Sequence, residues 1–176
     1  MNSGIPFMVA ALMAASAAAP GSTGAQTPIR FSGAAALALP IGDLGNAADP
    51  GVNLSLRGEG NVSRSKEWSV RGDLSWDRFS GRGLVDSYSF IGVAGNLVHR
   101  GTASRLYEFG GLGLYGGKTN FVDRLSRDDT NLGLQVGVGL DLTGGVHPTF
   151  VEFGLTNVLT PGNNSLWFPV RIGVRF

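Results

Sequence analysis

Side chains that could hold a metal ion or act as nucleophiles are few in this sequence. Cysteine is absent, which excludes thiolate metal sites and disulfides. His99 and His147 are the only histidines, and no cluster of carboxylates accompanies either of them. A zinc site needs three or four protein ligands. We therefore expect no metal site, no catalytic residues and no bound cofactor.

Residues 111–116, GLGLYG, match the glycine pattern of a dinucleotide-binding turn. That turn binds pyrophosphate only where a helix opens at the last glycine. The residues that follow, GKTNFVDRLSRDD, show no amphipathic helical pattern. We interpret the motif as part of a glycine-rich strand that permits close packing.

Charged side chains recur at alternating positions, a spacing that places them on one face of a strand. Arginines and carboxylates are mixed along these faces, so each charge has possible partners for bidentate pairing. We expect them to form a network inside a barrel, and its members are Arg57, Glu59, Arg71, Asp73, Asp77, Glu108, Asp141, Glu152 and Arg171.

Alternation of apolar and polar residues predicts the elements that position these charges. It is clearest in residues 52–63, 68–77 and 131–142, where one face is almost entirely Val, Leu, Trp and Gly. Weaker runs are 29–39, 87–100, 106–117, 149–159 and the C-terminal residues 166–176. In residues 87–100 both faces carry apolar residues, and we predict that Ile91, Val93 and Leu97 face outward and Asn96 inward. In residues 106–117 we expect Tyr107, Phe109 and Tyr115 opposite Glu108. The pattern predicts eight antiparallel strands of about ten to twelve residues in an all-β, up-and-down barrel.

The links between these strands also alternate in the sequence. Those at 40–50, 80–86, 118–130 and 160–165 are longer on the whole than those at 64–67, 101–105 and 143–147. An outer-membrane barrel shows this asymmetry, with short periplasmic turns and longer external loops.

The N-terminal residues differ from the rest. Residues 5–19 form an apolar run of the length found in signal peptides, although no Lys or Arg precedes it. We predict a cleavable signal peptide in residues 1–25 and one barrel domain in residues 26–176. The net charge of +1 gives no basic excess that would favour nucleic acid.

Two barrels fit such strands, a soluble ligand-binding barrel with an apolar interior and a membrane barrel with an apolar exterior. Only 15% of residues are charged, and the two lysines, Lys66 and Lys118, lie in predicted links. Aromatic residues near the strand ends match two belts at lipid–water boundaries, and those predicted for the belts are Phe31, Trp68, Trp76, Tyr107 and Tyr115. The membrane barrel is the better fit, with the charged faces inside.

The C-terminal stretch FPVRIGVRF resembles the C-terminal signal of Gram-negative outer-membrane barrels, which ends in Phe with apolar residues at every second position before it. The matching residues are Phe168, Val170, Ile172, Val174 and Phe176. Most of the chain is similar to the small eight-stranded class that includes OmpA-type, OmpX-type and opacity-like surface proteins. The resemblance implies secretion to the outer membrane and recognition of this strand by the barrel-assembly machinery. It also implies contact with membrane lipid and lipopolysaccharide.

Function then lies in the external loops or in support of the membrane, and we expect a non-enzymatic monomer with a lumen filled by polar side chains. A narrow ion-conducting pore is one alternative. A lipid-A-modifying barrel enzyme is another, but the close His-x-Ser pairing of that family is missing, since Arg100 and Gly101 follow His99 and Pro148 and Thr149 follow His147.

Overall fold

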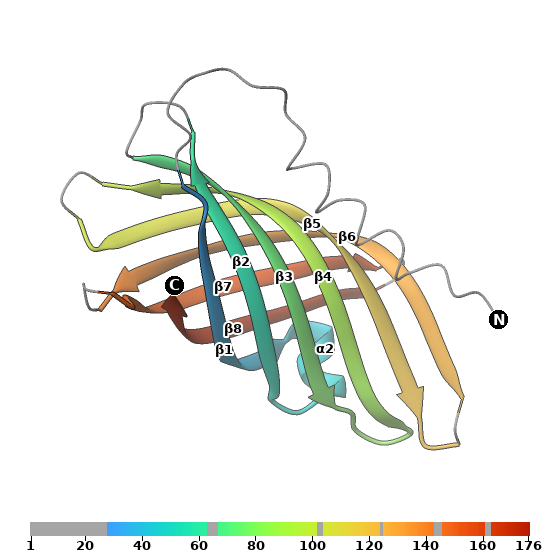
Figure 1. Cartoon of the computed structure of the whole chain (residues 1–176). Helices are drawn as coiled ribbons and strands as arrows, with labels where there is room; N and C mark the ends of the chain where they lie inside the picture. Colours follow the sequence, from blue (N-terminus) through green and yellow to red (C-terminus); the bar gives the residue numbers. More distant parts are fainter. Residues whose placement is uncertain (1–27, 63–66, 102–103, 124, 143–145, 161–162) are drawn as a thin grey trace.

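The computed structural model describes residues 28–62, 67–101, 104–123, 125–142, 146–160 and 163–176. The signal peptide predicted in residues 1–25 lies outside this part of the chain. Eight antiparallel strands form a closed barrel in which each strand pairs with its neighbour in sequence, and the last strand pairs with the first. The predicted eight-stranded up-and-down barrel is confirmed (Figure 1).

The elements follow one another around the barrel without crossovers. They are β1 (Arg30–Ile41), α2 (Gly42–Ala47), β2 (Gly51–Asn61), β3 (Trp68–Ser80), β4 (Val85–Arg100), β5 (Leu106–Phe121), β6 (Ser126–Asp141), β7 (Thr149–Thr160) and β8 (Asn163–Arg175). In Figure 1 the start of β1 and the end of β8 lie at one end of the barrel, which we call the terminus end. The helix α2 lies at the other, which we call the helix end. Among the described residues, no helix is long and apolar enough to cross a membrane.

The expectations about strand and link lengths are wrong. Strands β4, β5 and β6 each have 16 residues, more than predicted. The charged link expected at residues 118–130 is mostly strand, because β5 continues to Phe121 and β6 begins at Ser126. Opposite charges face each other across this hairpin, with Lys118 in register with Asp128, and such cross-strand pairs stabilise a sheet. The asymmetry of link lengths predicted from the sequence is therefore absent, and only residues 81–84 separate β3 from β4.

The helix α2 is an element that the sequence did not predict. Its six residues include two glycines, and it begins at Gly42 with a positive φ of 60°. The Leu44 side chain is buried at the helix end, against aromatic residues of the strands. Arg82, in the link between β3 and β4, contacts Asp49 at 2.6 Å and donates a hydrogen bond to the carbonyl oxygen of Gly45 at 3.3 Å. These tertiary contacts, rather than helix propensity, hold the segment.

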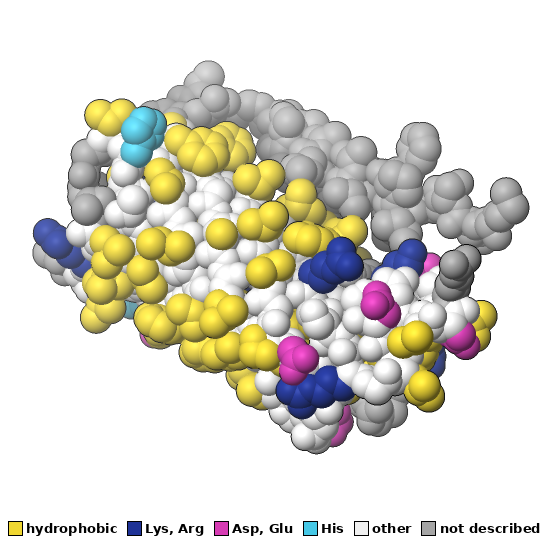
Figure 2. All heavy atoms as spheres, turned by 90° about the horizontal axis from the view of Figure 1, so that it is seen from below, with side chains coloured by type: hydrophobic (Ala, Val, Ile, Leu, Met, Phe, Trp, Pro, Cys, Tyr) yellow, Lys and Arg dark blue, Asp and Glu magenta, His cyan; other side chains and the backbone are white. Residues whose placement is uncertain are grey.

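Period-two alternation separates two faces of the barrel wall. Figure 2 shows hydrophobic side chains over the middle of one outer face, with charged side chains gathered mainly toward one end. Large apolar side chains on this outer wall are about half exposed, for example Leu54, Val136 and Ile172 at 52%, 51% and 61%. The opposite faces of the same strands bury Arg57, Gln135 and Arg171 to 4% exposure. The barrel is therefore apolar outside and polar inside.

Candidate functional site

The barrel interior is centred on the carboxylate of Glu152, which is fully buried. Nη1 of Arg71 donates a hydrogen bond to Oε1 of Glu152 at 2.8 Å, and the Tyr107 hydroxyl donates to the same oxygen at 2.9 Å. On the other side, Nη1 of Arg57 lies 2.8 Å from Oε2 in an ionic contact, and Nη1 of Arg171 lies 4.0 Å from it. Three strands, β2, β3 and β8, thus direct arginines at one carboxylate on β7.

Two aspartates extend the charged cluster along the axis. Nε of Arg71 is 2.9 Å from Oδ1 of Asp73, an ionic contact without hydrogen-bond geometry between these two atoms. Asn96 donates from Nδ2 to Oδ2 of Asp73 at 3.1 Å. Asp77, toward the helix end, accepts hydrogen bonds from Nδ2 of Asn53 at 2.8 Å and from Nε1 of Trp167 at 3.1 Å.

Two further ion pairs lie at the terminus end. Arg100 donates hydrogen bonds to both carboxylate oxygens of Glu59, and Ser69 donates to Glu59 at 2.8 Å. Nη1 of Arg175 donates to Oδ1 of Asp141 at 2.5 Å. These pairs are partly exposed, unlike those around Glu152.

Aromatic rings cover the guanidinium groups. Arg71 lies 4.2 Å from the centroid of Phe109, and Arg57 lies 5.4 Å from that of Phe150. Arg100 and Arg175 approach Tyr107 at 4.6 and 5.6 Å. The contacts of the buried Arg57 and Arg71 are desolvated, and desolvated cation–π contacts are worth about 2 kcal/mol.

A separate aromatic cluster occupies the interior at the helix end. Trp167 stacks on Phe90 with ring centroids 5.0 Å apart, and it meets Phe79 and Tyr115 edge-on at 5.8 and 6.1 Å. The side chain of Leu44 on α2 belongs to the same buried cluster. The interior is thus divided into apolar packing at the helix end and paired charges toward the terminus end.

The charges of the buried cluster balance. Arg57, Arg71 and Arg171 face Asp73, Asp77 and Glu152, and all six are buried. Burying an unpaired charge is costly, so a set with equal numbers of positive and negative groups suits a closed interior. Among the described residues, no group of three or more His, Cys, Asp or Glu side chains could hold a metal ion.

The structure places one member of the predicted network elsewhere. Glu108 is on the outer wall with its side chain 69% exposed, where its Oε1 lies 3.1 Å from Nδ1 of His99. Leu106 and Leu112 face outward on the same strand, and both are more than half exposed. The other eight members lie on the inner face or its rim. They are Arg57, Glu59, Arg71, Asp73, Asp77, Asp141, Glu152 and Arg171.

Two residues predicted for the outer aromatic belts are inside. Tyr107 is 4% exposed and Tyr115 is fully buried. The physical reason is that each hydroxyl has a polar partner in the interior: Tyr107 donates to Glu152, and the Tyr115 hydroxyl accepts a hydrogen bond from Gln135. Trp68 is on the outer wall, 41% exposed, as is Phe31 at 54%. Trp76 has the same outward parity on β3.

The residues of the C-terminal signal also lie on the outer face. Ile172, Val174 and Phe176 are 61%, 40% and 67% exposed, and Phe168 and Val170 share their parity. The backbone N–H of Phe176 donates to the carbonyl oxygen of Phe31 at 3.0 Å. On β4, Ile91 and Leu97 face outward and Asn96 inward.

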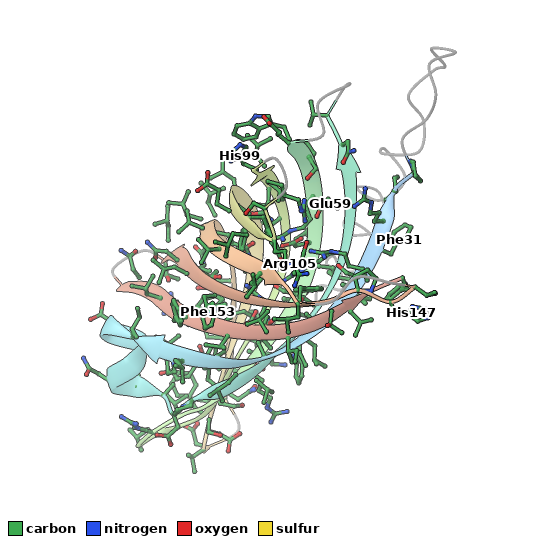
Figure 3. All side chains as sticks on the ribbon, turned by 90° about the vertical axis from the view of Figure 1, so that its left-hand side faces the viewer. Phe31, Glu59, His99, Arg105, His147 and Phe153 are labelled. Carbon is green, nitrogen blue, oxygen red and sulfur yellow. The ribbon has the colours of Figure 1, made fainter. Side chains whose placement is uncertain are left out.

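Several interior residues were missed from the sequence. Trp167, Phe109 and Phe150 are buried apolar residues, and they have no charge that would indicate that they face the lumen. The available signal was parity. Trp167 and Arg171 are separated by an even number of positions on β8, so their side chains point to the same face of the strand. The two histidines do not meet: Figure 3 shows His99 and His147 on different sides of the barrel.

No protein-family model matches the sequence, and no curated protein sequence matches it. Solved structures do match. Neisserial surface protein A superposes with a TM-score of 0.58 at 15% identity, covering 84% of this chain and 95% of that one. Ail of Yersinia pestis, in complex with the heparin analogue sucrose octasulfate, gives 0.60 at 16% identity, with 86% and 99% covered. The N-terminal β-barrel domain of Pseudomonas aeruginosa OprF gives 0.53 at 12%, with 86% and 99% covered. The chain has the fold of the small outer-membrane β-barrels. In such a barrel the polar residues described above line the lumen, and the apolar outer wall is the surface available to lipid.

Proposed function

We propose that the protein is an integral outer-membrane β-barrel of a Gram-negative bacterium, without enzymatic activity and with a lumen filled by polar side chains. The observation that carries this proposal is the sidedness of the wall. Leu54, Val136 and Ile172 are about half exposed, whereas Arg57 and Glu152 are buried at the centre. A water-soluble barrel has the reverse arrangement.

The height of the apolar wall supports insertion in a bilayer. On β5, Glu108 and Lys118 are the outward-facing charged residues, ten positions apart. The outward residues between them are Gly110, Leu112, Leu114 and Gly116. Ten residues at about 3.4 Å, tilted by about 40°, span about 26 Å, close to the lipid-facing band of such barrels.

The filled lumen supports a structural role rather than transport. An eight-stranded barrel has an interior only wide enough for its side chains, and here ion pairs and the aromatic cluster occupy it. Function then lies in membrane support or in surface contacts made by the links at the helix end. Lipopolysaccharide and membrane lipid are the partners we propose for the outer wall, and we propose a monomer.

Fractionation and gel mobility test location and barrel closure together. The expected result is recovery with outer membranes, and a band that migrates faster unheated than after boiling in detergent. Recovery in the aqueous fraction without detergent would refute the proposal. Discrete conductance steps in planar bilayers would favour the narrow pore instead.

A second experiment addresses biogenesis. The barrel-assembly machinery is the proposed partner of the C-terminal strand, and removing the terminal ring with Phe176→Ala is expected to lower the amount of assembled barrel in cells. Phe176 is 67% exposed, so refolding of the purified variant in detergent should be unchanged. Normal assembly in cells would argue against recognition through this residue.

A further inference from the structure

An exposed hydrogen-bonded pair of side chains on the apolar outer wall has no role in the proposed structural function. It is formed by His99 of β4 and Glu108 of β5, which are directly opposite each other in register. Nδ1 of His99 and Oε1 of Glu108 are 3.1 Å apart. The ring of Trp68 on β3 lies against His99, with centroids 4.5 Å apart.

A shallow groove continues from this pair along the wall. It has a volume of about 530 Å³ and is lined by the pair, by Trp68 and by apolar residues that include Leu97 and Val136. Gly110 contributes no side chain, so part of the groove is open to the backbone. The lining is apolar except at the His99–Glu108 end.

We propose that this groove binds a phospholipid whose headgroup carries a primary ammonium group. The inference rests on the proposed insertion in a membrane. The acyl chain lies along the apolar part of the groove, and the ammonium meets Glu108.

Charge complementarity to Glu108 favours an ammonium headgroup, and hydrogen bonding selects one that has N–H donors. A carboxylate accepts hydrogen bonds only, so the proton between the pair is on Nδ1 of His99. Within the described residues, Oε2 of Glu108 has no hydrogen-bond partner, and the side chain is 69% exposed. A primary ammonium has three N–H donors that can reach Oε2 and, in the neutral ring, Nε2 of His99. A trimethylammonium group has no N–H to donate.

The position of the pair matches the depth of lipid headgroups. A charge on the lipid face of a barrel is costly at the midplane and nearly free at the interface. Glu108 marks the terminus-end limit of the apolar band on β5, and Trp68 next to it is of the residue type enriched at that level. The ammonium group of the headgroup further offsets the charge of Glu108.

Binding, rather than catalysis, fits this constellation. The cross-strand neighbours of His99 are Trp68 and Glu108, and neither side chain has a hydroxyl that could act as a nucleophile. The His99–Glu108 pair is therefore suited to bind a lipid headgroup.

The test uses the folded barrel in detergent micelles, titrated with phosphatidylethanolamine, phosphatidylcholine or phosphatidylglycerol of identical acyl chains. Bound lipid is counted by native mass spectrometry. We expect phosphatidylethanolamine to be retained about tenfold more strongly than phosphatidylcholine, the value of one hydrogen bond to a charged group. Glu108→Gln should reduce the preference to near unity. The matched control is Asp128→Asn, which removes an exposed carboxylate at the other end of the same wall and should preserve the preference.

The outcomes distinguish a failure of the proposed lipid site from a failure of the proposed membrane barrel. Each variant is first shown to be a closed barrel by heat-modifiable mobility, and Glu108→Ala replaces Glu108→Gln if the latter does not fold. Equal retention of the three lipids, a preference for phosphatidylglycerol, or a preference unchanged in Glu108→Gln would overturn the site while leaving the membrane barrel intact. A protein that stays soluble without detergent would overturn both.

Discussion

Arg71 of β3 and Glu152 of β7 meet inside the barrel, 81 residues apart in sequence and 2.8 Å apart between Nη1 and Oε1. Arg57 and Arg171 approach the same carboxylate from β2 and β8. The Arg71–Glu152 contact joins β3 and β7, which share no backbone hydrogen bonds, and it links opposite parts of the wall across the lumen. Its energetic value depends on both partners being present, because each is buried.

Substituting Glu152 by Gln should destabilise the barrel strongly. The change keeps the shape but leaves three buried arginines with two aspartates, and breaking a buried ion pair costs about 3–5 kcal/mol. Urea unfolding in micelles, followed by gel mobility, measures the loss. Glu108→Gln, the same change on the outer wall, should stay within about 0.5 kcal/mol. Equal effects of the two substitutions would contradict the placement of Glu152.

Tyr107→Phe should have a smaller effect on the same equilibrium. The substitution removes only the hydroxyl that donates to Glu152, and the loss of one hydrogen bond to a charged group costs about 1.5–3 kcal/mol. Tyr88→Phe is the matched control, because the hydroxyl of Tyr88 has no hydrogen-bond partner among the described residues and its side chain is half-buried. A Tyr107→Phe variant as stable as the control would place the Tyr107 ring on the outer wall, as predicted from the sequence.

The sequence was informative where alternation was strict. In β2 and β3, charged residues alternate with Val, Leu and Trp, so the faces of Arg57, Arg71 and Asp73 followed directly from a period of two. The closure of the sheet into a barrel was predicted as well, because a closed barrel is the arrangement in which eight amphipathic strands have no unpaired edge. These inferences use local pattern alone.

Local pattern failed where the interior is not polar. On β5 the aromatic rings of Tyr107 and Phe109 face inward because they cover arginines that come from other strands. Glu108 shares the outer face with His99, its partner in register on β4. The helix α2 is stabilised by Leu44, which packs against aromatic residues that are far from it in the sequence. Each of these depends on contacts between strands, which a single sequence does not display.

Leu44→Ala tests whether α2 is anchored in the interior. Leu44 is 4% exposed, and truncating a buried leucine costs about 2–5 kcal/mol because a cavity remains. Leu84→Ala is the control at the same end of the barrel, since Leu84 is 82% exposed and should change stability by less than about 0.5 kcal/mol. Urea unfolding of both variants gives the comparison. A Leu44→Ala variant as stable as Leu84→Ala would mean that the helix does not close this end.

Tryptophan fluorescence tests the sidedness of the wall. The protein has three tryptophans. Trp68 and Trp76 face outward, whereas Trp167 is 1% exposed inside the barrel. Lipids with brominated acyl chains quench a ring only on close approach, so they should quench much of the wild-type emission. In the double variant Trp68→Phe, Trp76→Phe, only Trp167 remains, and the fraction quenched should fall to near zero. Undiminished quenching in this double variant would place Trp167 against lipid and reverse the two faces of β8. The single variant Trp167→Phe completes the comparison, because removing the interior ring should raise the quenched fraction above that of the wild type.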